Sequence, residues 1–371
     1  MSLVPFEGGD REEPGDPFEE HRDSRGLRLG WTTGTCASAA AKAAALGLFT
    51  GTPPPLVDVA LPNGHRQYFD VEVEGATRAV VVKDAGDDPD CTDGARITAR
   101  VKLADKSSPT RLLAGPGVGT VTKRGLGLEL GRPSITPVPE RMILGALAEA
   151  TELSLLVTFS VPDGEEMAAH TTNGRLGIVG GISILGTTGV VKPYSTAAWR
   201  SSIVQQIDVA AAQGEPTMIL ATGSRSERLA MKLNPGLDPV CFVEVGDYTG
   251  TALRRAASVG MVNAVLVGMA GKITKLAAGV MMTHFRRSKV DGQLLAAVAK
   301  TTRAPTEVVR AATETNTARH FFETCIAHEA VEPLRKVCEM AREACEQHTK
   351  GVLSVDVLMS DFEGSRIVAR G

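Results

Sequence analysis

The feature that most constrains the fold is a regular alternation of strand-like and helix-like segments in the second half of the chain. Apolar segments typical of strands lie at 177–185, 217–222, 240–245 and 262–268. Helix-forming segments lie between them at 195–213, 225–233 and 248–259. Strands that are connected through helices pair in parallel. The alternation therefore predicts an open α/β sheet, followed by helices over 270–349 and a final pair of strands over 351–369.

The first half of the chain has a different pattern. Residues 35–48 are rich in Ala and predict a helix that ends near Gly51. Asn63-Gly64 between alternating segments predicts a hairpin. Further strands are expected at 78–83, 95–103, 117–122 and 153–161, and a helix from Pro137 to about residue 150. We therefore expect two domains, an α+β domain over 27–170 and an α/β domain with a helical extension over 171–371.

The remaining residues, 1–26, are rich in Glu, Asp, Gly and Pro and are predicted to be a disordered acidic tail. The tail holds eight acidic and three basic residues, so the rest of the chain is nearly neutral and shows no nucleic-acid footprint. The six cysteines form no CxxC pair, which favours a reducing compartment. Neither a signal peptide nor a membrane span is visible. We expect a cytoplasmic protein that binds neither nucleic acid nor membrane.

Three glycine-containing segments fall at the ends of predicted strands. They are 177–191, 221–224 and 268–272. Open α/β sheets bind ligands beyond the carboxyl ends of their strands, and glycine lets a backbone approach a ligand closely. The alternative is that all three are ordinary tight connections. The GxGxxG fingerprint is absent and the segment ending at Lys272 lacks the rest of a P-loop, which argues against NAD enzymes and kinases.

Two further segments carry charge. The loop 83–94 contains Asp84, Asp87, Asp88, Asp90 and Asp93 at a spacing that does not match an EF-hand. These carboxylates can form turns, contact a ligand or bind a cation. Residues 115–143 combine glycines with Lys123 and Arg124, which suits either an anionic ligand or a hairpin with solvated charges.

His284 lies beside Arg286 and Arg287. Neighbouring positive charge favours neutral imidazole, which suits proton transfer, although a single histidine is more often structural. The residues alone therefore indicate a two-domain enzyme that binds a small anionic or nucleoside ligand.

Several blocks of the sequence resemble one family. Residues 32–44, 83–94, 117–126 and 173–195 are similar, in this order, to the cobalt-precorrin-5B C1-methyltransferase family of the CbiD type. The run GGISILGTTG at 180–189 is specific to that family. Residues 268–287 resemble its GHIGK-containing block, although Met269 and Ala270 stand where the family has His and Ile. Gly174 and Thr136 also depart from the family's Pro and Asn.

The resemblance implies a fold and a reaction. The fold is an N-terminal domain like domain 2 of ribosomal protein S5, joined to a Rossmann-like domain. The reaction transfers the methyl group of S-adenosylmethionine to C-1 of cobalt-precorrin-5B, giving cobalt-precorrin-6A in anaerobic cobalamin biosynthesis. Cobalt arrives in the substrate, so no protein-bound metal is expected, and neighbouring enzymes of the pathway are potential partners. The alternatives are another corrinoid position, a metal-free ring, or a corrin carrier without activity.

Methyl-transfer chemistry on this scaffold suggests three groups of site residues. The candidates for a catalytic base are His284, Asp84, Asp87 and Asp88. The candidates for donor binding are Gly180, Gly181, Gly186, Thr187, Thr188 and Glu244. The candidates for binding the carboxylates of the substrate are Lys123, Arg124, Arg175, Lys272, Arg286 and Arg287.

Overall fold

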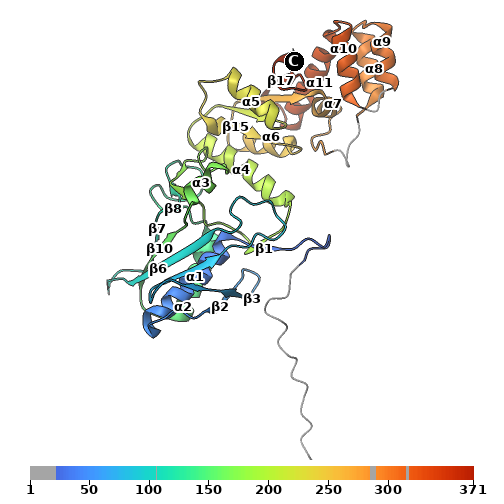
Figure 1. Cartoon of the computed structure of the whole chain (residues 1–371). Helices are drawn as coiled ribbons and strands as arrows, with labels where there is room; N and C mark the ends of the chain where they lie inside the picture. Colours follow the sequence, from blue (N-terminus) through green and yellow to red (C-terminus); the bar gives the residue numbers. More distant parts are fainter. Residues whose placement is uncertain (1–21, 106, 285–289, 315–316) are drawn as a thin grey trace, which may run out of the picture. The chain divides into compact units, whose positions relative to one another are not determined.

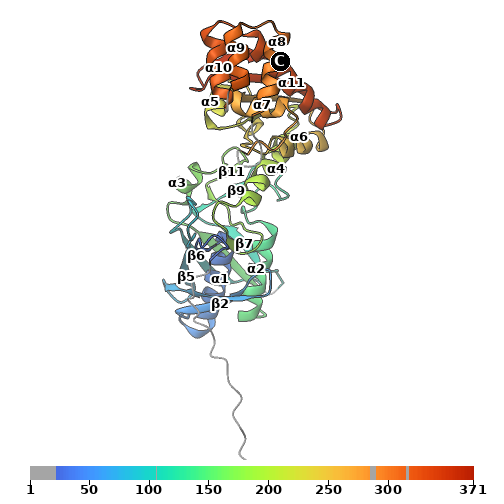
Figure 2. The ribbon, with the colours of Figure 1, turned by 90° about the vertical axis from the view of Figure 1, so that its right-hand side faces the viewer.

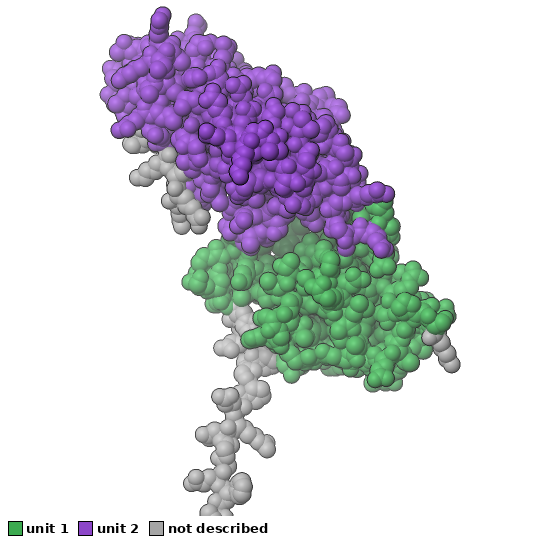
Figure 3. Space-filling view, turned by 180° about the vertical axis from the view of Figure 1, so that it is seen from behind, with its two compact units in different colours: residues 1–122, 130–174, 178–194 green, residues 123–129, 175–177, 195–371 purple. Residues whose placement is uncertain are grey.

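The computed structural model describes residues 22–105, 107–284, 290–314 and 317–371. These residues form two compact units (Figure 3). Unit 1 comprises the described residues up to Thr122, with Leu130–Gly174 and Ile178–Tyr194. Unit 2 comprises Lys123–Glu129, Arg175–Gly177 and the described residues from Ser195 to Gly371.

Unit 1 is built around one five-stranded sheet in the order β4-β5-β6-β10-β7 (Figure 1). Its strands are β4 Glu72–Val73, β5 Arg78–Val82, β6 Arg96–Leu103, β10 Leu155–Ser160 and β7 Arg111–Ala114. The predicted hairpin forms from β2 Leu56–Ala60 and β3 Arg66–Asp70, which pair antiparallel. The structure confirms the expected strands 78–83, 95–103 and 153–161 as β5, β6 and β10. The strand β7, which pairs parallel with β10, was not predicted.

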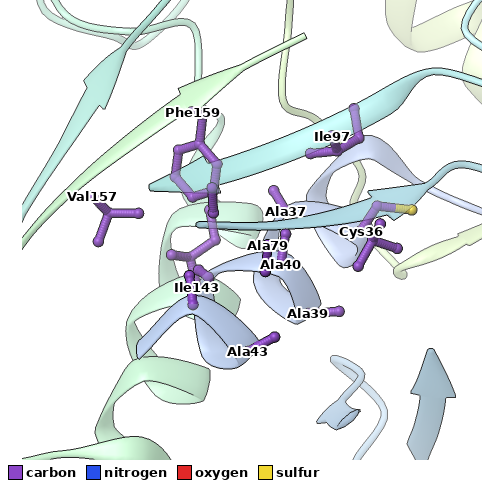
Figure 4. Close-up of a cluster of buried hydrophobic side chains, with 14 of the residues drawn as sticks. Cys36, Ala37, Ala39, Ala40, Ala43, Ala79, Ile97, Ile143, Val157 and Phe159 are labelled. Atoms are coloured by element: carbon purple, nitrogen blue, oxygen red, sulfur yellow. The ribbon is translucent and has the colours of Figure 1, made fainter. Parts of the chain in front are cut away.

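The core of unit 1 is the helix α1, Thr33–Thr50, packed against β5, β6 and the helix α2, Pro137–Ala150. Cys36, Ala37 and Ala40 are fully buried, and Figure 4 shows them in one cluster with Ala79 and Ile97 of the sheet. Because alanine is small, the helix approaches the strands closely along its length. Thr32 caps the first turn, and Gly51 ends the helix at a φ of 86°, near the end that the sequence predicted.

One predicted strand was assigned to the wrong sheet. The segment 177–185 does not begin the parallel sheet but forms β11 Ile178–Val179 and β12 Gly181–Ile182 in unit 1. The strand β11 pairs with β9 Thr120–Val121, and β12 pairs with β8 Gly117–Val118. A third short ladder joins β1 Gly30–Trp31 to β13 Val190–Val191. These glycine-rich segments pair over only two residues each. Strands this short have no run of apolar residues from which they can be predicted. The helix α3, Gly164–Ala169, was also not predicted.

Unit 2 contains the predicted parallel sheet, in the order β15-β14-β16-β17-β18. Its strands are β14 Thr217–Ala221, β15 Phe242–Glu244, β16 Asn263–Met269, β17 Ser354–Ser360 and β18 Ile367–Arg370. The first four strands in the order are parallel and β18 is antiparallel to β17. The chain passes from β14 to β15 on one side and then crosses to β16 on the other.

The helices of unit 2 also match the prediction. The connections around the sheet are α4 Thr196–Ala212, α5 Ser224–Leu233, the 3₁₀ turn η1 Pro239–Cys241, α6 Thr249–Ser258 and α7 Ala270–Ala277. The extension contains α8 Gly292–Thr301, α9 Thr306–Glu314, α10 Ala318–Ala327 and α11 Glu332–His348, which pack against one another (Figure 2). Within the described residues, no helix is long and apolar enough to cross a membrane.

The predicted tail, 1–26, lies outside the described residues up to position 21. From Arg22 the chain is hydrogen-bonded, since Arg22 forms a β-bridge with Arg28 and Gly26 N donates to Asp23 O. The predicted domain boundary after residue 170 remains a prediction, and the compact units alternate along the chain between residues 122 and 195.

Candidate functional site

The carboxyl ends of β14, β15 and β16 meet at Lys272 in unit 2. Lys272 Nζ donates to the carbonyl oxygen of Thr222, which follows β14, at 2.8 Å. It also lies 3.2 Å from Oδ1 of Asp247, which follows β15. Lys272 itself stands in the first turn of α7, directly after β16. A single ammonium group therefore links the ends of three adjacent strands.

The close approach of β14 and β16 depends on a glycine. A Cβ atom on Gly268 would lie 2.7 Å from Thr222 Oγ1. Thr222 N donates to Val267 O at 2.9 Å, which extends the ladder by one residue beyond β14. Glycine at 268 thus allows Thr222 to reach the position where its carbonyl oxygen accepts from Lys272.

Asp247 also holds the segment that leads to His284. Oδ1 of Asp247 accepts from the Thr283 hydroxyl at 3.0 Å, and its carbonyl oxygen accepts from Thr283 N at 3.2 Å. Lys275 Nζ donates to Thr283 O at 2.8 Å. His284, which is half-buried, is thereby tied through its chain neighbour to the same strand ends.

Glu244 is the last residue of β15 and is half-buried. Burial and the neighbouring carboxylate of Glu227 raise its pKa, while Lys272 and Arg175 oppose that shift. The backbone N–H of Ser224, at the start of α5, also stabilises the ionised form. The end of β15 therefore presents a carboxylate beside the turn that follows β14.

Two predicted substrate-binding cations have partners within unit 2. Nη1 and Nη2 of Arg175 lie 2.6 and 3.2 Å from the carboxylate oxygens of Glu227. Lys123 Nζ lies 2.8 and 2.9 Å from the carboxylate oxygens of Asp238. Arg124 is exposed. Arg286 and Arg287 lie outside the described residues.

The acidic loop of unit 1 uses its carboxylates to organise itself and its neighbours. Asp84 pairs with Arg28 and accepts from Gly86 N at 2.8 Å, and Asp87 accepts from Arg28 N at 2.7 Å. Asp88 accepts from Tyr194 N at 2.8 Å. Burial raises the pKa of Asp84, but the hydrogen bonds from Arg28 and from Gly86 N outweigh this effect, so that the pKa is lowered overall. The Asp84 carboxylate is therefore a weaker base than a free one. Of the roles that the sequence had left open, the structure shows that these carboxylates bind neighbouring segments of unit 1.

The remaining two carboxylates of this loop are also engaged. Asp90 pairs at 2.7 Å with Lys83, whose side chain is almost fully buried, and Asp93 accepts from Ala85 N at 2.8 Å. No group of three or more His, Cys, Asp or Glu residues within the described ranges could hold a metal ion.

Packing accounts for two of the predicted donor-binding glycines. A Cβ on Gly181 would lie 2.0 Å from the Gly117 carbonyl carbon, and one on Gly186 would lie 2.5 Å from Thr32 Oγ1. Gly180 is exposed, as are Thr187 and Thr188. All five of these residues belong to unit 1, whereas Glu244 belongs to unit 2.

Sequence reasoning did not single out Thr222 as a ligand of Lys272, and it missed Asp247 and Thr283. Asp247 was detectable, because it is an acidic residue two positions after the predicted strand 240–245. Thr283 was not detectable, because its position depends on the fold of the segment after α7.

Comparison with known proteins tests the resemblance directly. The profile of the CbiD family matches residues 20–193, and the profile described as the CbiD C-terminal domain matches residues 282–371. A protein of Salinispora arenicola named cobalt-precorrin-5B C(1)-methyltransferase is 52% identical over 352 residues, which are 92% of this chain and 92% of that protein. A Rubrobacter xylanophilus protein of the same name is 51% identical, covering 95% of this chain and 93% of that protein.

One solved structure is also similar, a cobalamin biosynthesis protein (cbiD) from Archaeoglobus fulgidus. It is 32% identical, with a TM-score of 0.40, over 70% of this chain and 83% of that one. The two profiles and the named relatives confirm the predicted resemblance, and the chain belongs to the CbiD family.

Proposed function

We propose that this chain transfers the methyl group of S-adenosylmethionine to C-1 of cobalt-precorrin-5B, giving cobalt-precorrin-6A. The observation that carries the proposal is identity above 50%, over more than nine tenths of both chains, to proteins named cobalt-precorrin-5B C(1)-methyltransferase. Identity at this level over the whole length favours a shared reaction rather than a shared fold alone. The chain is accordingly assigned as a methyltransferase of cobalamin biosynthesis.

The chemistry at the strand ends of unit 2 supports S-adenosylmethionine as donor. In nucleotide-binding parallel sheets, the first strand is followed by a turn into a helix. A carboxylate about 20 residues beyond that turn accepts hydrogen bonds from the ribose hydroxyls. Glu244 stands at this place relative to Ser224, at the end of β15. We therefore assign Glu244 to the ribose and describe residues 171–371 as the Rossmann-like domain. For residues 27–170, the likeness to domain 2 of ribosomal protein S5 rests on the resemblance.

The sulfonium donor supplies an activated methyl group, so the protein's task is to orient the two reactants and exclude water. His284 is our candidate for a base, because Asp247 and Thr283 hold its segment at the same strand ends as Glu244. Asp84, Asp87 and Asp88 are weaker candidates, since each already accepts a hydrogen bond within unit 1.

The substrate carries many carboxylates, which arginine binds well. Among the described candidate cations, Arg124 is exposed, whereas Lys123, Arg175 and Lys272 are paired inside unit 2. We keep Arg124, Arg286 and Arg287 as the proposed substrate clamps. Gly180, Thr187 and Thr188, which belong to unit 1 and are exposed, are also proposed as ligand contacts. Neighbouring pathway enzymes as partners and the cytoplasm as compartment remain proposals from the sequence.

The test is an anaerobic incubation with cobalt-precorrin-5B and S-adenosylmethionine labelled with ¹³C in the methyl group, analysed by mass spectrometry and carbon NMR. We expect the label at C-1 and one equivalent of S-adenosylhomocysteine. Label at another carbon would keep the methyltransferase and change the substrate assignment. Tight binding of the corrinoid by folded protein without any transfer would instead indicate a carrier.

A further inference from the structure

We propose that Lys272 and Asp247 form a subsite for the α-amino-acid end of the methyl donor. The Lys272 ammonium binds the α-carboxylate, and the Asp247 carboxylate binds the α-ammonium group. The inference rests on the proposed function, because it takes S-adenosylmethionine as the donor and adds the residues that recognise its amino-acid part.

The pair lies where a ligand binds in this type of sheet. Lys272 and Asp247 follow β16 and β15, the two strands that flank β14 in the sheet. This is the point at which the strand order reverses, and ligands of open α/β sheets bind at the carboxyl ends of the strands there. Glu244, our ribose ligand, ends β15 three residues before Asp247. The ribose and amino-acid ends of one ligand can therefore be held by one strand end and its neighbour.

The contacts leave both groups able to bind more. Asp247 uses Oδ1 for both Lys272 and Thr283, so that Oδ2 has no hydrogen-bond partner among the residues whose structure is described. The ammonium of Lys272 has three N–H donors and makes two contacts, with Thr222 O and Asp247 Oδ1. The side chains keep 33% and 26% of their surface exposed, respectively, which gives a ligand access.

The charges match a zwitterion. An α-amino acid carries an ammonium and a carboxylate on one carbon, and a cation and an anion 3.2 Å apart on the protein present the complementary arrangement. The distance in this pair is also longer than in two other lysine–carboxylate pairs of the described part of unit 2, which is 2.8 to 2.9 Å for Lys123–Asp238 and 2.9 Å for Lys336–Glu339. A ligand that contributes both charges replaces one loose ion pair by two charge-assisted contacts.

Thr249 provides a further polar group close by in sequence. Its hydroxyl, at the start of α6 and two residues beyond Asp247, is fully buried and has no hydrogen-bond partner in the described part of the chain. Buried hydroxyls are normally satisfied, so this unsatisfied one is unusual, and it lies in the first turn of α6, directly after the segment that holds Asp247.

The test compares two nucleosides that differ in the amino-acid end. S-adenosylhomocysteine carries it and 5′-methylthioadenosine lacks it, so the ratio of their dissociation constants measures recognition of that end. Calorimetry on the full chain should show that wild type prefers S-adenosylhomocysteine by about tenfold to a hundredfold, as expected for charge-assisted contacts. Lys272→Met and Asp247→Asn should each remove most of this preference and leave the affinity for 5′-methylthioadenosine within about twofold.

Three further variants make the result specific. Lys272→Arg keeps the cation and should retain most of the preference, even if Lys272→Met is poorly folded. Lys232→Met removes an exposed lysine of α5 and should change neither constant. Glu244→Gln should weaken both nucleosides by the same factor, because both carry the ribose.

The outcomes separate this inference from the proposed function. An unchanged preference in folded Lys272→Met and Asp247→Asn would overturn the subsite while the methyl-transfer assay still stands. If wild type binds neither nucleoside and does not transfer the methyl group, the proposed donor is overturned, and the subsite with it.

Discussion

Nη1 of Arg175 lies 2.6 Å from Oε1 of Glu227 and 3.2 Å from the carbonyl oxygen of Phe242. The guanidinium thus joins the short segment Arg175–Gly177 to α5 and to β15 within unit 2. Glu227 keeps only 10% of its side-chain surface exposed, so its charge depends on this partner. The sequence predicted Arg175 as a clamp for a carboxylate of the substrate, and the structure shows that a carboxylate of the protein already occupies it.

Breaking this pair should reduce stability more than it affects substrate binding. Arg175→Met leaves the Glu227 carboxylate buried without its main partner, which we expect to cost about 2 to 4 kcal/mol of the free energy of unfolding. Urea unfolding measures the loss, and the double variant Arg175→Met with Glu227→Gln should recover part of it. Unchanged stability together with a raised KM for the corrinoid would restore the clamp role.

The strands of unit 2 were predictable from the sequence and the partner of Arg175 was not, and both outcomes have one physical origin. Strands such as β14 and β16 are predictable because apolar runs and the caps of intervening helices are local signals. The partner of Arg175 is 52 residues away along the chain, and only the folded sheet brings the two together. Sequence can therefore list charged residues, but it does not decide whether a ligand or the protein neutralises them.

A network of four charges in unit 1 should make stability fall in acid. Hydrogen bonds from Arg66, aided by Lys42, hold the pKa of Asp58 and of Glu149 at about 2, although partial burial opposes this. Both folded-state values lie below the ordinary values of ~4, so the stabilisation is complete above about pH 4.5 and is lost as the pH falls through 2. Because Glu149 is 35% exposed, solvent screening should reduce the total to about 1 to 2 kcal/mol.

The variant Arg66→Met tests this pH dependence. It removes the main partner of both carboxylates, so the free energy of unfolding should depend less on pH between 4.5 and 2 than in wild type. Arg78→Met is the matched control, since it removes an arginine of β5 that pairs with the single carboxylate of Glu74 and not with Asp58 or Glu149. Equal acid slopes in wild type and Arg66→Met would show that the network does not titrate as described.

Gly181 should be required for the fold of unit 1 rather than for the donor. Gly181→Ala places a methyl group 2.0 Å from the backbone of Gly117, across the β12–β8 pair, and neither backbone can move without breaking that pair. We expect a loss of about 3 kcal/mol or more in the free energy of unfolding. Gly174→Ala, where no atom lies within 4 Å, should be nearly neutral. A stable Gly181→Ala protein with weakened S-adenosylhomocysteine binding would reinstate this glycine as a donor contact.

The same pair shows why the family-specific run 180–189 was informative about the family but not about the role of each glycine. Its residues are restricted by contacts that occur far along the chain, such as Gly186 against Thr32 and Gly181 against Gly117. A glycine fixed by packing and a glycine fixed by a ligand look identical in one sequence. Glu244 is different, because a carboxylate ending a buried strand has a local signal and the structure places it at a strand end as predicted.

The thiols give a prediction that depends on burial alone. Cys36, Cys241, Cys325, Cys338 and Cys345 are buried, and burial raises the pKa of each to about 12, which leaves roughly one thiolate in 10⁴ at pH 8. Cys91 is exposed, and although burial of its sulfur and the charge of Asp90 raise its pKa, reagents can reach it. Native protein titrated with Ellman's reagent at pH 8 should therefore release about one equivalent quickly, and six after unfolding in guanidinium. The fast equivalent should be absent in Cys91→Ser. In wild type, the rate of this fast phase should increase as the pH rises. A second fast thiol in the native protein would mean that one of the five buried sites opens on the timescale of the reaction.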